Sequence, residues 1–338
     1  MSTPVAIAAQ IAPQRSTQYA DLAGQLALAE LTASPLRHRL QGAGLWRIAG
    51  QDYAVFALPG PGLSAADGEL LASFAMLGNL FELFERVGAV EGPLLRPLAA
   101  AYPFVLSPDI AATRRYKGKT NELFTLFMCN VAKFASGFAD RPWRELRVFD
   151  PLCGGGTTLL TALALGAHAA GIERQRGDVE STATFVTQFC REARIAASVR
   201  DERLRALDAH RWHIRIGRER DDPRRLLLAA GDSALTRDLL AGFGRPHLVV
   251  ADLPYGIQHK APLAALLDAC LPAWAAAMEP GGALAFAWDG TRATRSEMAA
   301  EIERLTPLRV VAEPPYDAVA HRVDRVIRRR DLIVARAP

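Results

Sequence analysis

Helical and strand-like patterns of apolar positions are mixed over the first hundred residues. Apolar residues recur at helical spacing over 19–31 and again over 70–87, which predicts two helices. Between them, residues 44–49 and 53–58 have the composition of two short strands around a glycine-containing turn, which predicts a hairpin. Together these segments predict a small α+β module over residues 1–108.

A change of pattern follows a proline-punctuated connector that runs from Pro93 to Pro108. The strands predicted beyond it, all rich in apolar residues, are 146–150, 169–173, 226–232, 247–252 and 283–288. They alternate with helical patterns, which is typical of a mostly parallel sheet with helices on both faces. Residues 109–338 are therefore predicted to form an α/β, Rossmann-like domain, and residues 323–334 are predicted to add a terminal antiparallel hairpin.

Composition then narrows the class of protein. The chain has 338 residues, of which 50% are hydrophobic, so it has enough apolar material for a core and is not intrinsically disordered. Its four cysteines form no CxxC pair and have no histidine partners at zinc spacing, so we expect no metal site. They are predicted to be free thiols in a reducing cytoplasm.

Neither targeting nor membrane insertion is predicted. No basic segment precedes the short apolar run at the N-terminus, so we expect no secretory signal. No apolar stretch approaches the roughly 20 residues that a membrane-spanning helix needs. A cytoplasmic protein with no membrane partner is expected.

The charge distribution leaves two interpretations open. The formal net charge is +4 and the pI is about 9.0, which weakly favours a polyanionic partner. The basic residues are nearly all arginine, however, which also fits a GC-rich genome. Arginines gather at 191–225 and 322–330. These stretches are either nucleic-acid contacts, with Trp212 stacking on a base, or solvated helix and hairpin faces.

The glycine-rich turn from Asp150 to Thr157 (Asp-Pro-Leu-Cys-Gly-Gly-Gly-Thr) joins a predicted strand to a predicted helix. Glycines there let the backbone approach a ligand, and the first turn of the helix offers free N–H groups. The spacing differs from the GxGxxG of dinucleotide sites. An acidic residue ahead of the glycines suits a positively charged group, such as the α-ammonium of a methionine moiety.

Two further acids follow the next strands of the predicted sheet. Glu173 ends the second strand, from which a carboxylate can accept both ribose hydroxyls, and Asp232 ends the third, within reach of an adenine amino group. Each acid alone has a structural alternative, a helix cap or a solvated strand end. Three acids at successive strand ends favour a ligand site.

The fourth strand ends in Asp252-Leu-Pro-Tyr-Gly, and here the chain resembles a known family. The motifs and their order resemble those of class I S-adenosylmethionine (SAM)-dependent methyltransferases that methylate amino groups. They are most similar to the THUMP-associated enzymes that make N2-methylguanosine in tRNA. The Lys117–Thr125 lead-in and the His321–Val323 segment are also similar. The resemblance covers residues 116–336.

This resemblance implies SAM as cofactor and an amine held by the strand-end loop. Asp252 and the Pro254 carbonyl are predicted to accept the N–H groups of an exocyclic amine, and Tyr255 to offer a stacking face for the base. Leu253 departs from the usual first proline of the motif. The cofactor site implied by the resemblance comprises Asp150, Pro151, Cys153, Gly154, Gly156, Thr157, Glu173, Arg174, Asp232, Ser233 and Asp252.

The predicted function is thus SAM-dependent N-methylation of a nucleobase in RNA, with guanine N2 in tRNA favoured. Two alternatives stay open. One is N-methylation of a small-molecule amine or amide, because the N-terminal module is shorter than the THUMP-containing region of the resembling family. The other is a SAM-binding RNA module without catalysis, against which the intact Asp252 and Pro254 argue.

Overall fold

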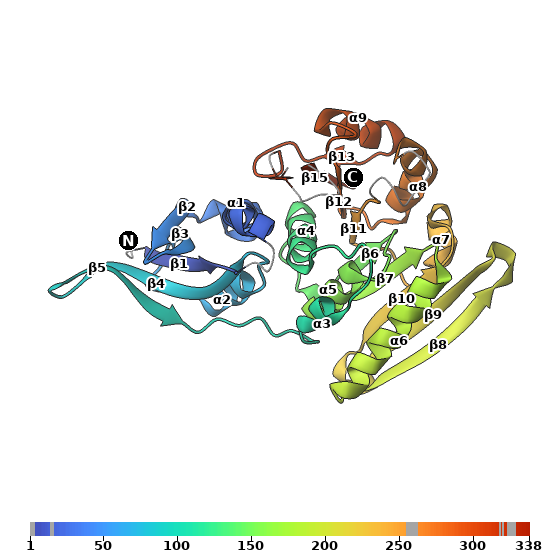
Figure 1. The fold of residues 1–338 in the computed structure, drawn as a ribbon, viewed down its shortest axis with the longest axis horizontal. Coiled ribbons are helices and arrows are strands. Elements are labelled where there is room, and N and C mark those ends of the chain that lie inside the picture. Colours follow the sequence, from blue (N-terminus) through green and yellow to red (C-terminus); the bar gives the residue numbers. More distant parts are fainter. Residues whose placement is uncertain (1–3, 14–16, 255–262, 318, 320, 323–328) are drawn as a thin grey trace.

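The computed structural model describes residues 1–338 except 1–3, 14–16, 255–262, 318, 320 and 323–328. Figure 1 shows two sheets, a smaller one built from the N-terminal residues and a larger one built from the rest of the chain. The smaller sheet and its helices comprise β1 (Val5–Ile11), α1 (Thr17–Ala33), β2 (Gln41–Ile48), β3 (Gln51–Leu58), α2 (Ala65–Ala72), β4 (Leu77–Val87) and β5 (Val90–Leu98). Its strand order β2-β3-β1-β4-β5 places the β-α-β-β-α-β succession in a ferredoxin-like arrangement with one added strand.

The hairpin predicted in the N-terminal module is confirmed as β2 and β3, whereas the second predicted helix is wrong. Of residues 70–87, only 70–72 are helical, at the end of α2, and residues 77–87 form β4, which pairs with β1 and β5. A register shift in the pairing with β1 inserts one extra residue in β4. Because of this extra residue, Leu77 and Leu80 both face the same core although they are three positions apart, which is the spacing of apolar residues expected of a helix.

The connector is also shorter than predicted. Pro93 and Pro97 belong to β5, an edge strand of the small sheet, where a missing N–H costs least. Residues 99–108 then join the two sheets. The division of the chain at residue 108 into two independent domains stays a proposal, because one apolar core extends from α1 to the helices of the larger sheet.

The N-terminal module contacts α4 through both apolar and polar groups. Phe74, which follows α2, packs against Phe134 of α4, with ring centroids 5.6 Å apart. Glu30 of α1 is fully buried and accepts hydrogen bonds from the backbone N–H of Ala75 (3.0 Å) and from Nδ2 of Asn130 in α4 (2.6 Å).

The larger part of the chain forms a mixed sheet with helices on both faces. Its strands are β6 (Arg147–Asp150), β7 (His168–Glu173), β8 (Ala197–Leu204), β9 (Ala209–Ile216), β10 (Arg224–Ala230), β11 (Leu248–Asp252), β12 (Ala283–Asp289), β13 (Arg309–Val310), β14 (His321–Arg322) and β15 (Arg329–Arg336). Its helices are α3 (Asp109–Thr113), α4 (Glu122–Ala135), α5 (Thr157–Leu165), α6 (Arg176–Glu192), α7 (Thr236–Leu239), α8 (Leu263–Ala277) and α9 (Arg295–Leu305).

Strand order confirms the predicted fold class. The sheet runs β13-β15-β12-β11-β6-β7-β10-β9-β8, and the five strands from β12 to β10 are parallel. β15 is antiparallel to β12, β13 and β14, which confirms a late antiparallel pair, although residues 323–328 of the predicted hairpin lie outside the described residues. Helices α4, α5 and α6 pack on one face and α7, α8 and α9 on the other.

The interpretation of residues 191–225 as a solvated helix face is wrong beyond the end of α6. Residues 197–216 form the antiparallel β8–β9 hairpin, which extends the sheet beyond β10 (Figure 1). Charged residues interrupt the apolar alternation of β8, an exposed edge strand, so a strand pattern is hard to recognise there. Trp212 on β9 is only 8% exposed and packs under Arg176 of α6, so it cannot stack on a base.

Candidate active site

The glycine-rich turn lies between β6 and α5, as predicted, and it is tightly packed. Gly154 and Gly156 have positive φ values of 47° and 87°. A Cβ on Gly155 would come within 2.5 Å of the Tyr116 ring, and one on Gly156 within 2.9 Å of Thr182, whereas the space beside Gly154 is open. Only glycine fits at 155 and 156, and the open side of Gly154 leaves room for a ligand.

Carboxylates follow the ends of three adjacent strands in the sheet order β6-β7-β10. Glu173 accepts a hydrogen bond from the Gly154 N–H (3.1 Å) and another from the Gln175 N–H (2.8 Å). Its oxygens keep further lone pairs, so the carboxylate can still accept hydroxyl groups. Asp232 is exposed and accepts a hydrogen bond from the Ala234 N–H (2.9 Å), which is the capping alternative considered from the sequence.

Asp150 is the most strongly perturbed of these acids. It is 3% exposed, and its burial raises the pKa to about 7, although hydrogen bonds from Thr158 and the Leu152 N–H lower it. The carboxylates of Asp252 and Glu173 raise the same pKa further, so the three acids share one neighbourhood. Desolvated acids that repel one another are stabilised by a cationic ligand. The sulfonium and ammonium groups of SAM supply such charges.

Asp252 ends β11 beside this acidic neighbourhood. Its side chain is 11% exposed, and its Oδ2 accepts a hydrogen bond from Thr120 Oγ1 (2.5 Å) and lies 3.4 Å from Arg330 Nη2. Burial raises the pKa of Asp252, while Arg330 and Thr120 lower it. Its Oδ1 is buried and has no hydrogen-bond partner within the described residues. An unsatisfied carboxylate oxygen in such a place suits a donor on a ligand.

Several other predicted residues already have partners inside the protein. Ser233 donates a hydrogen bond to the Pro151 carbonyl (2.7 Å) and accepts one from Trp274 Nε1 (2.9 Å), so its hydroxyl is engaged in the packing of the turn. The Thr157 hydroxyl lies 2.5 Å from the Tyr116 hydroxyl. Cys153 is buried, and burial raises the pKa of its thiol, as expected of a packing residue.

The remaining predicted residues are placed less fully. Arg174 is exposed and, with Asp232, lies close enough to Cys270 to influence the pKa of that thiol. Pro254 is half-buried, two residues after the end of β11. Tyr255 lies outside the described residues.

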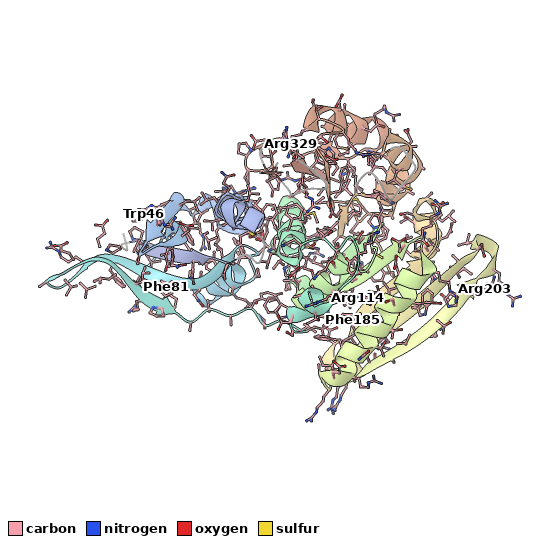
Figure 2. All side chains as sticks on the ribbon, viewed as in Figure 1. Trp46, Phe81, Arg114, Phe185, Arg203 and Arg329 are labelled. Atoms are coloured by element: carbon pink, nitrogen blue, oxygen red, sulfur yellow. The ribbon has the colours of Figure 1, made fainter. Side chains whose placement is uncertain are left out.

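Sequence reasoning did not single out four side chains that lie at the candidate site. Tyr116 covers the glycine turn, and Arg114 next to it lies between the Tyr116 and Phe185 rings, 5.1 Å from the Phe185 centroid (Figure 2 labels Arg114 and Phe185). Thr120 lies within the Lys117–Thr125 lead-in, which was noted only for its resemblance. Arg330 belongs to the arginine run at 322–330, for which a nucleic-acid contact and a solvated hairpin face were both left open, yet it is only 6% exposed.

Neither a metal site nor a membrane-spanning helix was expected from the sequence. Among the residues that the structure describes, no group of three or more histidine, cysteine, aspartate or glutamate side chains could hold a metal ion. The described helices include none long and apolar enough to cross a membrane. All four cysteines are buried free thiols.

Comparisons with known proteins identify the family. No curated protein matches the chain. Among solved structures, TrmN from Thermus thermophilus is similar at 14% identity and a TM-score of 0.45, over 99% of this chain and 100% of that one. The T. thermophilus 16S rRNA N2 G1207 methyltransferase RsmC, solved with AdoMet and guanosine, has 12% identity and a TM-score of 0.38, over 89% and 60% of the two chains. SMU.1697c from Streptococcus mutans, solved with SAH, has 11% identity and a TM-score of 0.36, over 56% and 88%.

The family model provides the assignment. The model of UPF0020, described as an RMKL-like methyltransferase domain, matches residues 139–318, more than half of the chain. That range includes the glycine-rich turn, the three strand-end acids and Asp252. The match confirms the resemblance found in the sequence and SAM as the cofactor. The chain belongs to the UPF0020 family of RMKL-like methyltransferases and is a SAM-dependent methyltransferase.

Proposed function

We propose that this methyltransferase acts on an exocyclic amino group of a nucleobase in RNA, with guanine N2 in tRNA as the favoured target. One observation carries the proposal. Asp252 ends the strand next to the cofactor turn as a buried carboxylate with one oxygen held by Thr120 and Arg330 and the other without a partner in the described chain. Such a group is suited to accept an N–H from an amine.

The cofactor is proposed to lie along the edge formed by the ends of β6, β7 and β10. Asp150 and the turn from Cys153 to Thr157 face its methionine part, Glu173 its ribose and Asp232 its adenine. The open side of Gly154 and the mutual repulsion of the buried acids support this placement. When bound, SAM supplies an electrophilic methyl group on a positively charged sulfur.

The amine needs help from the protein because its lone pair is shared with the aromatic ring. Asp252 Oδ1 and the Pro254 carbonyl are proposed to accept its two N–H groups, which turns the lone pair out of the ring plane. A strong base is not needed, because the amine becomes acidic once it is alkylated and then loses its proton. Positioning of this kind is where most of the rate enhancement should arise.

Thr120 and Arg330 act through Asp252 as positioning residues. Both contact Oδ2, so they fix the carboxylate rotamer and leave Oδ1 for the substrate. Arg330 also lies over the Phe124 ring of α4, 5.1 Å from its centroid, which anchors the guanidinium. Its charge favours the ionised form of Asp252, the form that accepts two hydrogen bonds.

RNA as the substrate class is supported by the sequence resemblance and by charge. The lead-in at 117–125 and the Asp-Leu-Pro-Tyr loop resemble those of enzymes that methylate tRNA, and the chain is basic, with a pI of about 9.0. Exposed arginines such as Arg203 and Arg329 (Figure 2) give it a surface that attracts phosphates. Methylation of a small amine is the competing outcome.

The proposal is tested by methyl transfer from labelled SAM to unmodified RNA, followed by mass spectrometry of the nucleosides. The wild-type protein should produce an N-methylated base. Asp252→Ala should lower the single-turnover rate by about 10²–10³-fold, the effect of removing one positioned electrostatic partner, with nearly unchanged SAM affinity. Transfer at the wild-type rate by Asp252→Ala, or transfer to small amines and never to RNA, would contradict the proposal.

A further inference from the structure

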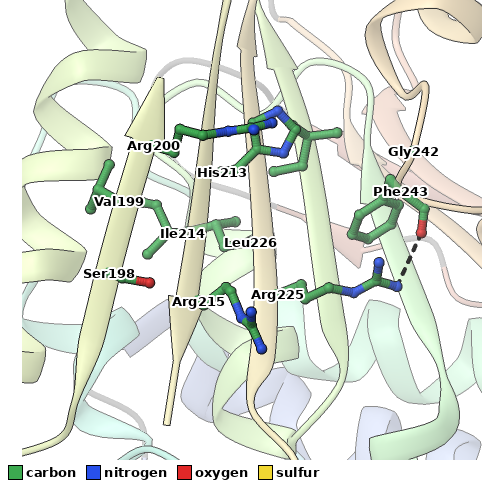
Figure 3. A pocket seen from close by; sticks show the side chains of 11 residues that line it. Ser198, Val199, Arg200, His213, Ile214, Arg215, Arg225, Leu226, Gly242 and Phe243 are labelled. Atoms are coloured by element: carbon green, nitrogen blue, oxygen red, sulfur yellow. Dashed lines mark hydrogen bonds between the residues drawn. The ribbon is translucent and has the colours of Figure 1, made fainter. Parts of the chain in front are cut away.

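The β8–β9 hairpin carries a groove that the methyl-transfer chemistry does not use. It has a volume of about 440 Å³ and crosses β8, β9 and β10 (Figure 3). Ile214 and Leu226 of these strands belong to the core that includes α6. Because side chains alternate along a strand, their neighbours Arg215 and Arg225 point to the opposite face, and the Phe243 ring closes one side there.

The groove is lined by basic side chains and by none that is acidic. Its lining includes Arg200, His213, Arg215 and Arg225, contributed by all three strands. Arg215 and Arg225 are directly opposite in the register of β9 and β10. Arg200 and His213 form a second cross-strand pair on β8 and β9, two residues away, which is about 6.6–6.8 Å along the strands.

Like charges directly opposite one another destabilise a sheet, so an anion bound in the groove would relieve the repulsion between Arg215 and Arg225. The internal partners are few. Arg215 pairs with Glu219, Arg225 donates to the Phe243 carbonyl (3.2 Å) and His213 lies 2.9 Å from Glu202. Arg200 is exposed and makes no ion pair or hydrogen bond with any residue that the structure describes.

The segment around the groove also has an excess of basic over acidic residues. Residues 197–225 contain nine arginines against six aspartates and glutamates. Guanidinium groups bind phosphate through paired N–H donors, and they remain charged at every relevant pH. An open groove with such groups on three adjacent strands matches a row of phosphates better than it matches one small anion.

We infer that this groove binds backbone phosphates of the RNA substrate, away from the base that is methylated. The inference rests on the proposed function. The groove begins at Arg225, at the start of β10, whereas Asp232 of the predicted cofactor site follows the end of that strand. The seven residues of β10 span about 20 Å. A polynucleotide can reach from one end to the other, and a small amine cannot.

The experiment measures the affinity of the full chain for a fluorescein-labelled, unmodified tRNA transcript as a function of salt. The variant Arg200→Gln/Arg215→Gln removes two charges from the groove. The matched control, Arg203→Gln/Arg220→Gln, removes two exposed charges that do not line the groove, one on β8 and one in the connection between β9 and β10. SAM affinity and thermal unfolding are measured for each protein to show that the fold and the cofactor site are intact.

The groove variant should bind the transcript about 10–30-fold more weakly at 0.1 M salt, and its log–log salt slope should be shallower by about 1.4. The control should stay within about threefold of the wild type. Arg200→Lys/Arg215→Lys should recover most of the affinity because it restores the charges. Arg200→Gln alone, which disrupts no internal contact, should show about half of the loss on a logarithmic scale if the double variant unfolds.

Equal losses in the groove variant and the control would overturn the inference, since they would show only the effect of net charge. It would also be overturned if the wild-type chain bound polyglutamate more tightly than RNA and the groove variant lost that affinity. The partner would then be an acidic protein. The proposed function is judged separately: RNA that binds through the groove but is never methylated contradicts that proposal and leaves this inference standing.

Discussion

Arg330→Gln is expected to shift the pH dependence of methyl transfer rather than abolish it. The substitution removes the charge 3.4 Å from Asp252 Oδ2 but leaves the hydrogen bond from Thr120 in place. Two unit charges at that distance interact by about 5 kcal/mol at an effective dielectric constant of about 20. Because one pKa unit corresponds to about 1.4 kcal/mol, the upper limit of the shift is between three and four units.

The sign of the shift follows from the causes at Asp252. Burial raises the pKa of this carboxyl and Arg330 lowers it, so the loss of Arg330 raises the pKa further. The ionised carboxylate is the form that accepts the amine, so activity falls as the pH decreases through this pKa. Rearrangement of Thr120 and entry of water reduce the change, and an acid that loses an adjacent arginine usually shifts by about 1–3 units. The acidic limb of the rate profile should therefore move upward by that amount.

The assay is single-turnover transfer with saturating SAM and RNA over a range of pH. Arg329→Gln is the matched control, because Arg329 is the adjacent residue of β15 but has no contact with Asp252. Arg330→Lys should show a smaller shift than Arg330→Gln. If Arg330→Gln lowered the rate by the same factor at every pH, the guanidinium would only support the fold, and the reasoning about Asp252 would be refuted.

Three further predictions concern the cofactor site and the N-terminal module. Glu173→Ala should weaken SAM binding, measured by calorimetry, by about 1–3 kcal/mol, and unchanged affinity would remove the ribose role. Burial raises the pKa of Asp150 to about 7, so binding of the cationic cofactor should release a proton, and the affinity should increase as the pH rises through 7. Calorimetry in buffers of different ionisation enthalpy measures this proton release, and its absence would contradict the prediction. Glu30→Ala should lower the free energy of unfolding by about 3 kcal/mol or more, because the donors at Ala75 and Asn130 lose their acceptor, and denaturant melts close to wild type would exclude that contribution. Burial raises the Glu30 pKa to about 7, above its unfolded value, so the stability gained from its protonation should be complete below pH 4.5 and lost as the pH rises through 7.

The parallel part of the large sheet could be predicted from the sequence because buried parallel strands are nearly continuous apolar runs. Segments such as Leu248–Asp252 and Ala283–Asp289 have this composition, and the glycine turn marks where β6 ends. Since the ends of parallel strands share one edge of the sheet, acids at those ends could be expected to gather there. Burial is the main cause of the raised pKa of Asp150, and the charges of Asp252 and Glu173 lie close enough to raise it further.

The parts that were missed depend on contacts that a local pattern does not contain. Thr120 and Asp252 are hydrogen-bonded although they are 132 residues apart in the sequence. Arg330 is buried only because β15 pairs with β12, and nothing in the sequence distinguishes it from the exposed Arg329 beside it. In β4, a single inserted residue turned a strand pattern into an apparent helical one. The β8–β9 hairpin was obscured because its polar face carries charges in place of the alanines and leucines of the buried strands.

The packing of α1 against α4 affects how this gene can be divided or recombined. A fragment that begins at residue 109 would keep the residues proposed to bind SAM but would expose Phe134 to water and leave Asn130 without Glu30. Exchange of the first hundred residues for an unrelated module would have the same effect. The replacement module would have to supply an apolar surface against Phe134 and a hydrogen-bond acceptor for Asn130. The two parts are therefore expected to be inherited together, with compensating substitutions across their boundary, even though all of the residues proposed to take part in methyl transfer lie in one of them.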